Sequence, residues 1–282
     1  MCLMEHKLQP AGASSADAKA RLEQLATECG YGCTWTFSPR AGFDGLVALT
    51  QAGTPPPVEP PLSNAACAQE RRLLALELDS MHVVLAYVPN SGRPGRLAFR
   101  LEQWEPSVRA LLSDLQRSGK PLLYQGDLNV AHERSLDAWG TTAAQFGGFK
   151  ASGRTREEAE AFEQLLDKCG LVDGFRFLHP SARSATCWAQ KRAGEAEQRE
   201  HWKRYDYALV SEGLARGSRQ LQLTEVRHRG DAFGGGRPDH VPIESVFALC
   251  VTSSALMGGS GSLPRRFEGD GSSAAEAVSV RF

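Results

Sequence analysis

The chain has no long hydrophobic run. No apolar stretch among its 282 residues approaches the roughly 20 residues that a membrane-spanning helix needs. The N-terminus also lacks the charged-then-apolar layout of a signal peptide. We therefore expect a soluble, intracellular protein that does not contact a membrane.

The cysteines show no pairing pattern. Seven are present, an odd number, and they are scattered along the chain without a CxxC pair. This spacing gives no indication of a disulfide framework or a zinc site. We expect reduced thiols, most of them buried.

An excess of charge of either sign is also absent. The chain has 32 Lys and Arg against 33 Asp and Glu, for a net charge of −1, so the total charge gives no sign of a nucleic-acid binder. Any phosphate-binding surface must be local. The candidates are Arg93, Arg96 and Arg100 in one segment and Lys203 and Arg204 in another, with a solvated mixed surface as the alternative.

What is present is an alternation of strand-like and helix-like segments, which predicts an α/β fold. Ser14 or Ser15 is expected to cap the first helix, Pro106 to kink or divide the second, and Thr155 with Glu158 to form the capping box of the third. Strands are expected over residues 45–50, 73–78, 82–87, 122–127, 205–211 and 240–249, and helices over residues 14–29, 97–115 and 155–169. We expect one catalytic domain over residues 1–250, followed by a disordered Ser/Gly/Ala-rich tail over residues 251–282.

The segment 122–132 is the most informative part of the chain. An apolar run ends there in the turn Gly126-Asp127-Leu128-Asn129. Gly126 gives the backbone freedom, and side chains two residues apart in an extended segment share a face. Asp127 can accept a proton while Asn129 donates hydrogen bonds. A purely structural turn at the end of a strand is the alternative.

Further polar side chains follow other predicted strands: Glu5, Tyr87 with Asn90, Asp206, and Asp239-His240. Together with Asp127 and Asn129 they provide the groups needed for metal-assisted hydrolysis of a phosphodiester. An acidic residue holds Mg²⁺, a carboxylate activates water, and a His oriented by Asp stabilises the phosphate charge. Amide and phenol donors hold the anion.

These motifs resemble those of exonuclease III-type apurinic/apyrimidinic (AP) endonucleases in the endonuclease/exonuclease/phosphatase superfamily. The family motifs CLQETK, GYSG, Y-x-PN-x-x-R, GDLNVAH, R-x-DY and SDHCP have counterparts in the same order. These are Cys2-Leu3-Met4-Glu5-His6-Lys7, Gly42-Phe43-Asp44-Gly45, Tyr87-Val88-Pro89-Asn90 with Arg93, residues 126–132, Arg204-Tyr205-Asp206-Tyr207 and Pro238-Asp239-His240-Val241-Pro242. The resemblance implies a four-layer α/β sandwich, in which two packed β-sheets are flanked by helices.

The resemblance also implies roles for individual residues. The implied catalytic residues are Asp127, which positions the nucleophilic water, and Asn129, Tyr87, Asp206 and His240. The implied ligands of Mg²⁺, with Mn²⁺ as an alternative, are Glu5, Asp239, Asp127 and Asn129. The implied contacts to DNA or phosphate are Asn90, Arg93, Asn129, Trp188, Trp202, Lys203 and Arg204.

The chain departs from the family pattern in three places. It begins after a strand and helix that the family places before its CLQETK segment, so we expect the fold to be N-terminally incomplete or to be a short form. Cys187 stands where the family has an aromatic residue that encloses the abasic sugar, and Lys203 is expected to join that wall. Between His132 and Thr155, Gly-, Ala- and Thr-rich sequence replaces an Asn-bearing segment. We expect these changes to affect abasic-site selectivity more than hydrolysis.

The function that the resemblance implies is Mg²⁺-dependent cleavage of double-stranded DNA 5′ to an abasic site, with 3′-phosphodiesterase or exonuclease activity. It also implies a monomer in the nucleus, with an organelle as the alternative. Two other functions are consistent with the sequence. One is an inactive relative that binds DNA or protein partners, and the other is a superfamily phosphodiesterase acting on a phosphoinositide, a sphingolipid or RNA.

Overall fold

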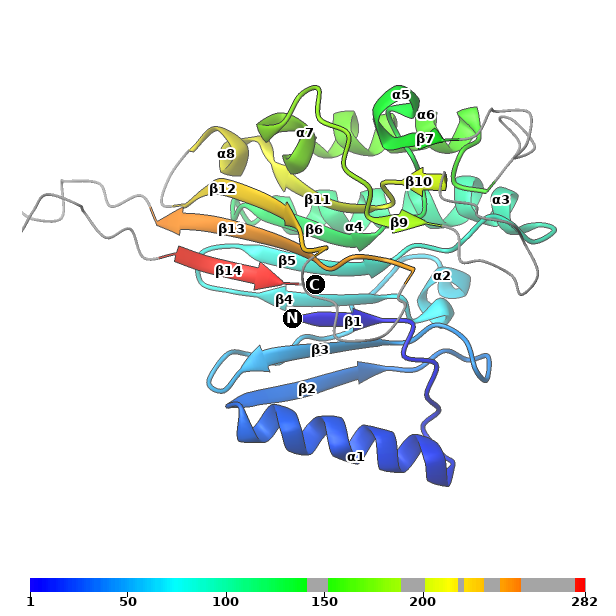
Figure 1. Ribbon diagram of the computed structural model, residues 1–282, viewed down its shortest axis with the longest axis vertical. Coiled ribbons are helices and arrows are strands. Elements are labelled where there is room, and N and C mark those ends of the chain that lie inside the picture. The colour runs from blue at the N-terminus through cyan, green and yellow to red at the C-terminus, as the bar shows by residue number, and fades with distance from the viewer. Residues whose placement is uncertain (141–151, 189–200, 218–220, 231–238, 250–276, 282) are drawn as a thin grey trace, which may run out of the picture.

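The computed structural model describes residues 1–140, 152–188, 201–217, 221–230, 239–249 and 277–281 (Figure 1). In this part of the chain, no helix has both the length and the apolar composition needed to cross a membrane. The strands form one five-stranded and three three-stranded sheets.

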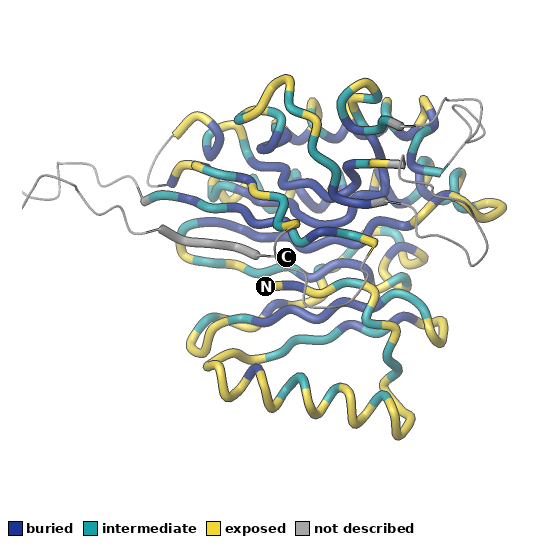
Figure 2. The backbone as a smooth tube through the Cα atoms, in the orientation of Figure 1, coloured by how far each residue is buried: buried dark blue, intermediate teal, exposed yellow. Residues whose placement is uncertain are grey.

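The five-stranded sheet is the centre of the fold. Its order is β4 (Leu73–Glu77), β5 (His82–Tyr87), β6 (Leu122–Asp127), β11 (Asp206–Ser211) and β8 (Leu171–Asp173). β5 and β6 pair in parallel and the other neighbours pair antiparallel. Every residue of β5 and β6 is buried, which explains why these two strands are nearly continuous apolar runs (Figure 2).

Helices cover one face of the central sheet. They are α3 (Arg96–Phe99), the π-helical turn η1 (Arg100–Trp104), α4 (Glu105–Gln116) and α6 (Arg156–Cys169). Trp104, Val108, Leu112 and Phe162 pack on alternate residues of β5 and β6. The predicted division of the second helix is confirmed, because α4 begins with Pro106 in its first turn, and the predicted capping box at Thr155 is present.

A second β-layer covers the opposite face. It contains the sheet β1 (Cys2–Met4), β3 (Leu46–Gln51), β2 (Tyr31–Thr36) and the sheet β12 (Leu221–His228), β13 (Ile243–Leu249), β14 (Ala277–Arg281). In β3 the side chains alternate: Leu46 and Ala48 pack toward the central sheet, whereas Val47 and Leu49 pack against α1 (Ala13–Glu28). The resulting order of helices, sheet, sheet and helix confirms the predicted four-layer α/β sandwich (Figure 1).

Short elements complete the described chain: α2 (Ala65–Glu70), α5 (Arg134–Asp137), β7 (Ala138–Gly140), α7 (Gly174–Leu178), β9 (Cys187–Trp188), β10 (His201–Lys203) and α8 (Glu212–Arg216). Strands β7, β10 and β9 form a small sheet of their own.

Two sequence predictions are wrong in detail. The N-cap of α1 is Gly12, without a side-chain cap, because the helix begins before the serines that were expected to cap it. Within the predicted disordered tail, Ala277–Arg281 form β14, which pairs with β13. Pairing with the edge of β13 provides hydrogen-bond partners for the backbone N–H and C=O groups of this segment, and composition alone does not reveal such a partner strand. Residues 251–276 and 282 lie outside the described residues.

Candidate active site

Strand register creates the centre of the site. In the central sheet Tyr87 lies opposite Asp127 across the β5–β6 pair, and Asp127 lies opposite Asp206 across the β6–β11 pair. Residues directly opposite each other on neighbouring strands project to the same face of a sheet. Three polar side chains from distant parts of the sequence therefore project together toward the second β-layer, at one end of the sheet.

The turn after β6 requires glycine at its start. Gly126 has φ 148°, and a Cβ atom at this position would lie 1.9 Å from the carbonyl oxygen of Ala86. Asn129, two residues after Asp127, has φ 50°, a left-handed conformation that Asn tolerates better than most residues. The backbone thus turns sharply enough to bring the Asn129 side chain back beside the Asp127 carboxylate.

Asp127 is a buried carboxylate held by Asn129. Its Oδ1 accepts the Asn129 backbone N–H at 2.8 Å, and its Oδ2 accepts the Asn129 amide at 3.3 Å. Burial raises the pKa of Asp127 to about 7, with His240 opposing the shift and the carboxylates of Asp206 and Glu5 adding to it. This carboxyl group is therefore poised to exchange a proton near neutral pH.

Asp206 and His240 form a dyad next to Asp127. The imidazole Nδ1 of His240 lies 2.8 Å from Asp206 Oδ2. Burial disfavours the imidazolium, but the Asp206 charge and hydrogen bond outweigh it and raise the pKa of His240 to about 10. The hydroxyl of Thr186 accepts the Asp206 backbone N–H at 3.0 Å, and Cys187 forms a β-bridge with His240, which fixes both partners. The ring is thus a held cation whose Nε2–H can point toward an anion.

Two amides extend the site. The Asn129 Nδ2 also donates to the Val88 carbonyl at 2.9 Å, so both of its hydrogens are engaged, and its Oδ1 accepts Nδ2 of Asn90 at 3.0 Å. The Asn90 Oδ1 accepts the Gly92 N–H and the Ser152 hydroxyl. In this arrangement Asn129 positions its neighbours, while Asn90 keeps one amide hydrogen without a partner among the described residues.

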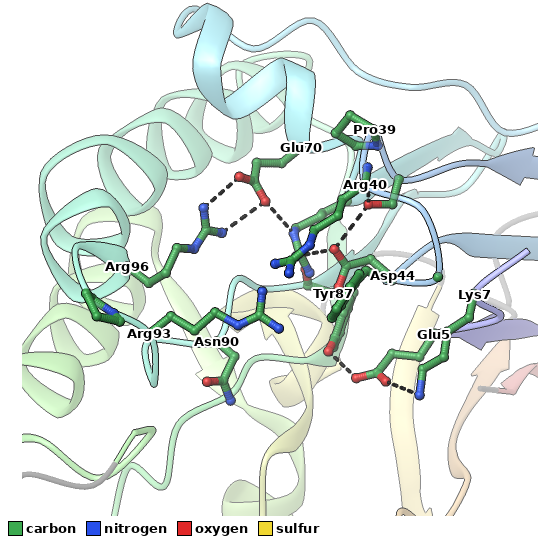
Figure 3. A pocket seen from close by; sticks show the side chains of 15 residues that line it. Glu5, Lys7, Pro39, Arg40, Asp44, Glu70, Tyr87, Asn90, Arg93 and Arg96 are labelled. Carbon is green, nitrogen blue, oxygen red and sulfur yellow. Dashed lines mark hydrogen bonds and ion pairs between the residues drawn. The ribbon is translucent and has the colours of Figure 1, made fainter. Parts of the chain in front are cut away.

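Glu5 lies on the other side of Tyr87. The Tyr87 hydroxyl donates to Glu5 Oε1, and the ammonium of Lys7 lies 3.3 Å from Glu5 Oε2 (Figure 3). These three residues border a cavity of about 530 Å³ that also includes Asn90 and Arg93. Burial raises the pKa of Tyr87 well above its usual range, so the phenol remains a hydrogen-bond donor.

His6, which the sequence interpretation missed, fixes the Glu5 backbone. Glu5 has φ 54°, in the left-handed region. The adjoining His6 ring contacts the Thr36 carbonyl through Nε2 at 2.9 Å and accepts the Leu8 N–H at Nδ1 at 3.0 Å. A Cβ at Gly45 would lie 2.4 Å from this ring, so the glycine leaves room for it. A lone His beside a predicted metal ligand gives no sequence signal for such a structural role.

The predicted metal ligands come together only in part. The described residues contain no group of three or more His, Cys, Asp or Glu side chains that could hold a metal ion. Glu5 and Asp127 are close enough to affect each other electrostatically, whereas Asp239 is exposed beside His240. Oxygen donors and an excess of acidic charge around Asp127 fit Mg²⁺, which proteins commonly hold through one or two carboxylates, with water and substrate phosphate.

Three basic residues predicted as candidates for a phosphate-binding surface are already paired. Arg204 is 1% exposed and forms ion pairs with Asp137 and Asp173, so its prediction as a DNA contact is wrong. Arg100 is buried and donates to the carbonyls of Leu128 and Asn129, which supports the catalytic turn from behind. Arg96 is engaged by both carboxylate oxygens of Glu70. A buried pair costs too much to break for a surface contact.

Among the remaining predicted contacts, Arg93 lines the cavity beside Glu5. Arg93 is exposed and lies over the ring of Phe43, 4.8 Å from its centroid. Trp202 is 38% exposed, and the ammonium of Lys203 lies over the ring of Tyr205. Burial lowers the pKa of Lys203. The side chain of Trp188, and residues 141–151 of the Gly/Ala/Thr-rich segment, lie outside the description.

A buried carboxylate beside an Asp–His dyad at one end of a four-layer α/β sandwich defines a phosphodiesterase-type hydrolase. Comparison with known proteins agrees. The chain is 30% identical over 250 residues to the exodeoxyribonuclease of Bacillus subtilis, covering 88% of each chain. It is 30% identical over 252 residues to a DNA-(apurinic or apyrimidinic site) endonuclease of Dictyostelium discoideum, covering 88% of this chain and 63% of that one. The chain belongs to the exonuclease III-type AP endonuclease family, as its motifs predicted.

Solved structures show the same fold. An AP endonuclease from Leishmania major, 25% identical, superposes with a TM-score of 0.65 over 87% of this chain and 77% of that one. A 3′-5′ exonuclease from Neisseria meningitidis, 22% identical, has a TM-score of 0.68 over 86% of each chain and supports the fold alone. No family model matches the sequence.

Proposed function

We propose that this protein is a DNA repair hydrolase that cuts the phosphodiester 5′ to an abasic site and leaves a 3′-hydroxyl. The observation that carries the proposal is the buried Asp127 carboxylate in register with Asp206, whose partner His240 is held at 2.8 Å. Family membership supports DNA as the substrate, because the relatives are named for nuclease activity on DNA.

Asp127 is the proposed base. Its two oxygens are oriented by Asn129, and its pKa of about 7 lets it take a proton from water near the operating pH. Both amide hydrogens of Asn129 are donated, one to the Val88 carbonyl and one to Asp127, so its proposed role is to orient the Asp127 carboxylate. Attack of the water on phosphorus would then break the bond from phosphorus to the 3′ oxygen of the sugar, which takes a proton from solvent and becomes the 3′-hydroxyl.

The phosphate is held by two kinds of donor. His240 remains protonated across neutral pH because Asp206 stabilises its charge, so it can stabilise negative charge that builds on a phosphate oxygen. Asn90, which keeps one amide hydrogen without a partner among the described residues, would be a second, neutral donor to the phosphate. The Tyr87 phenol completes this edge by orienting Glu5.

Divalent metal ions fit the acidic side of the site. Glu5, with Asp127 next to it, would hold Mg²⁺ or Mn²⁺, and Asp239 would assist from the His240 side. When bound, the ion supplies charge neutralisation for the phosphate and lowers the pKa of bound water. The Asp206 and Glu5 carboxylates both raise the pKa of Asp127, and a cation bound among these three carboxylates would relieve their mutual repulsion.

Abasic-site recognition is assigned to the wall formed by Cys187, Tyr205 and Lys203. Cys187 and Tyr205 pack together with Ala131, and Lys203 lies over the Tyr205 ring. A damaged nucleotide would have to leave the helix to reach this wall. An undamaged 3′ end could occupy the same site, so 3′-phosphodiesterase or exonuclease activity is also proposed.

The protein is proposed to act as a monomer, and a nuclear location stays a prediction because the relatives include a bacterial enzyme.

The test is incision of a duplex that carries one abasic site, with Mg²⁺ and with EDTA. We expect cutting 5′ to the site that depends on metal and is lost in Asp127→Asn and His240→Ala. The exposed residue Asp114, which pairs with Arg117, offers the matched control Asp114→Asn, which should cut at the wild-type rate. Full activity in both active-site variants would refute the mechanism. DNA binding without any incision would instead favour a non-enzymatic binding module.

A further inference from the structure

Two adjacent arginines have different surroundings. Arg71 and Arg72 connect α2 to β4. Arg71 is exposed and pairs with Glu59 across the surface. Arg72 is 8% exposed, and its guanidinium lies next to the cavity that borders Glu5 and Tyr87. Burying a guanidinium is costly unless its donors are satisfied, so its contacts indicate what the position is for.

Arg72 holds Tyr87 from both its backbone and its side chain. The Tyr87 N–H donates to the Arg72 carbonyl at 3.0 Å, which extends the β4–β5 pairing to the end of the strand. The Arg72 Nη1 contacts the Tyr87 carbonyl at 3.4 Å, and the guanidinium carbon lies 4.8 Å from the centre of the Tyr87 ring. A cation over the face of the ring limits how the ring can tilt. The ring's hydroxyl is the group that reaches Glu5.

The same guanidinium joins the two loops that border the cavity. Nη2 donates to Asp44 Oδ2 at 2.6 Å, and the Asp44 carbonyl accepts the Lys7 N–H, two residues after Glu5. Nε donates to Glu70 Oε2 at 2.8 Å. The Glu70 carboxylate also accepts hydrogen bonds from Nη1 and Nη2 of Arg96, the first residue of α3 (Figure 3).

We propose that Arg72 is a positioning residue for the reaction, which sets the Tyr87 hydroxyl against Glu5 and fixes the loops on either side of the cavity. The inference rests on the proposed function and adds a residue that no motif singled out. The three guanidinium nitrogens of Arg72 are directed at Glu70, the Tyr87 carbonyl and Asp44, so it acts through Tyr87. A planar fork with three donor directions is needed, because a lysine ammonium cannot reach Asp44, Glu70 and the Tyr87 carbonyl together.

The test is a double-mutant cycle on incision of abasic duplex DNA, with Arg72→Lys, Tyr87→Phe and the double variant. Arg72→Lys keeps the charge and is expected to lower kcat by about 10-fold to 100-fold, since small misplacements of catalytic groups cost this much. KM should change by less than about 3-fold, because the donors of Arg72 are already engaged within the protein. In the Tyr87→Phe background, Arg72→Lys should cost less than about 2-fold, because the hydroxyl that it positions is already gone.

Controls separate positioning from general stability. Arg71→Lys alters the adjoining exposed arginine and should leave kcat and the unfolding midpoint unchanged. If Arg72→Lys does not fold, Asp44→Asn removes one of its anchors and should show the same non-additivity with Tyr87→Phe. Equal losses in both Tyr87 backgrounds would overturn the positioning role while leaving the proposed function intact. Absence of incision by the wild-type protein would overturn both.

Discussion

The Asp206–His240 dyad predicts how the rate of incision depends on pH. Two groups must be in the right state at once: Asp127 ionised, with a pKa of about 7, and His240 protonated, with a pKa of about 10. The wild-type rate of incision should therefore rise as pH increases through 7, stay level, and fall as pH passes 10. Asp206→Asn keeps the shape of the side chain but removes the charge that is the main support of the imidazolium.

The size of the effect follows from the titration of His240. Without the Asp206 charge, burial is opposed only by weaker contributions, and we take the pKa back to its ordinary value of about 6.5. At pH 8 the protonated fraction then falls from about 99% to about 3%, so incision should slow about 30-fold. The alkaline limb should move from near pH 10 to near pH 6.5, so that the level region between pH 7 and 10 disappears.

The assay is the rate of incision of abasic duplex DNA at saturating Mg²⁺, measured from pH 5 to 10.5. The exposed residue Asp114, changed to Asn, is the control and should reproduce the wild-type profile. An alkaline limb that stays near pH 10 in Asp206→Asn would refute the reasoning, because His240 would then not depend on Asp206 for its charge.

Four further predictions concern stability, DNA binding and incision. Arg204→Met should lower the free energy of unfolding by about 3–5 kcal/mol in denaturant titrations, because it leaves two buried carboxylates unpaired. Arg93→Ala should leave unfolding unchanged but lower the slope of log affinity for DNA against log salt by about 1, as for one lost phosphate contact; an unchanged slope would exclude that contact. Gly126→Ala should abolish incision and destabilise the fold, because its Cβ would collide with the Ala86 carbonyl, and a variant that melts like the wild type would contradict the geometry. Burial lowers the pKa of His228 to about 4, so protonation of this residue disfavours the folded state. The free energy of unfolding should therefore fall by about 2–3 kcal/mol as pH falls from about 6.5 to 4. His228→Phe should flatten this part of a stability-against-pH curve.

The sequence by itself was enough for the α/β class and for the family, and the four layers followed from the family resemblance of its motifs. Continuous apolar runs in β3, β5 and β6 and the capping box at Thr155 are local patterns that can be seen in the sequence directly. The role of Gly126 could also be predicted, since a strand that turns directly into Asp-x-Asn needs a residue without a Cβ. Residue types and order in the motifs then predicted which side chains belong to the site.

Tertiary structure alone decided which charges are free. Arg71 and Arg72 are adjacent and identical in type, yet one is exposed and the other is buried against Tyr87. Arg204 matches a family motif but is enclosed by two carboxylates contributed by segments more than 30 residues away. Ion pairing depends on partners that only strand register and loop packing bring within 3 Å. The same register places Asp206 opposite Asp127, where its charge adds to the rise in pKa that burial causes.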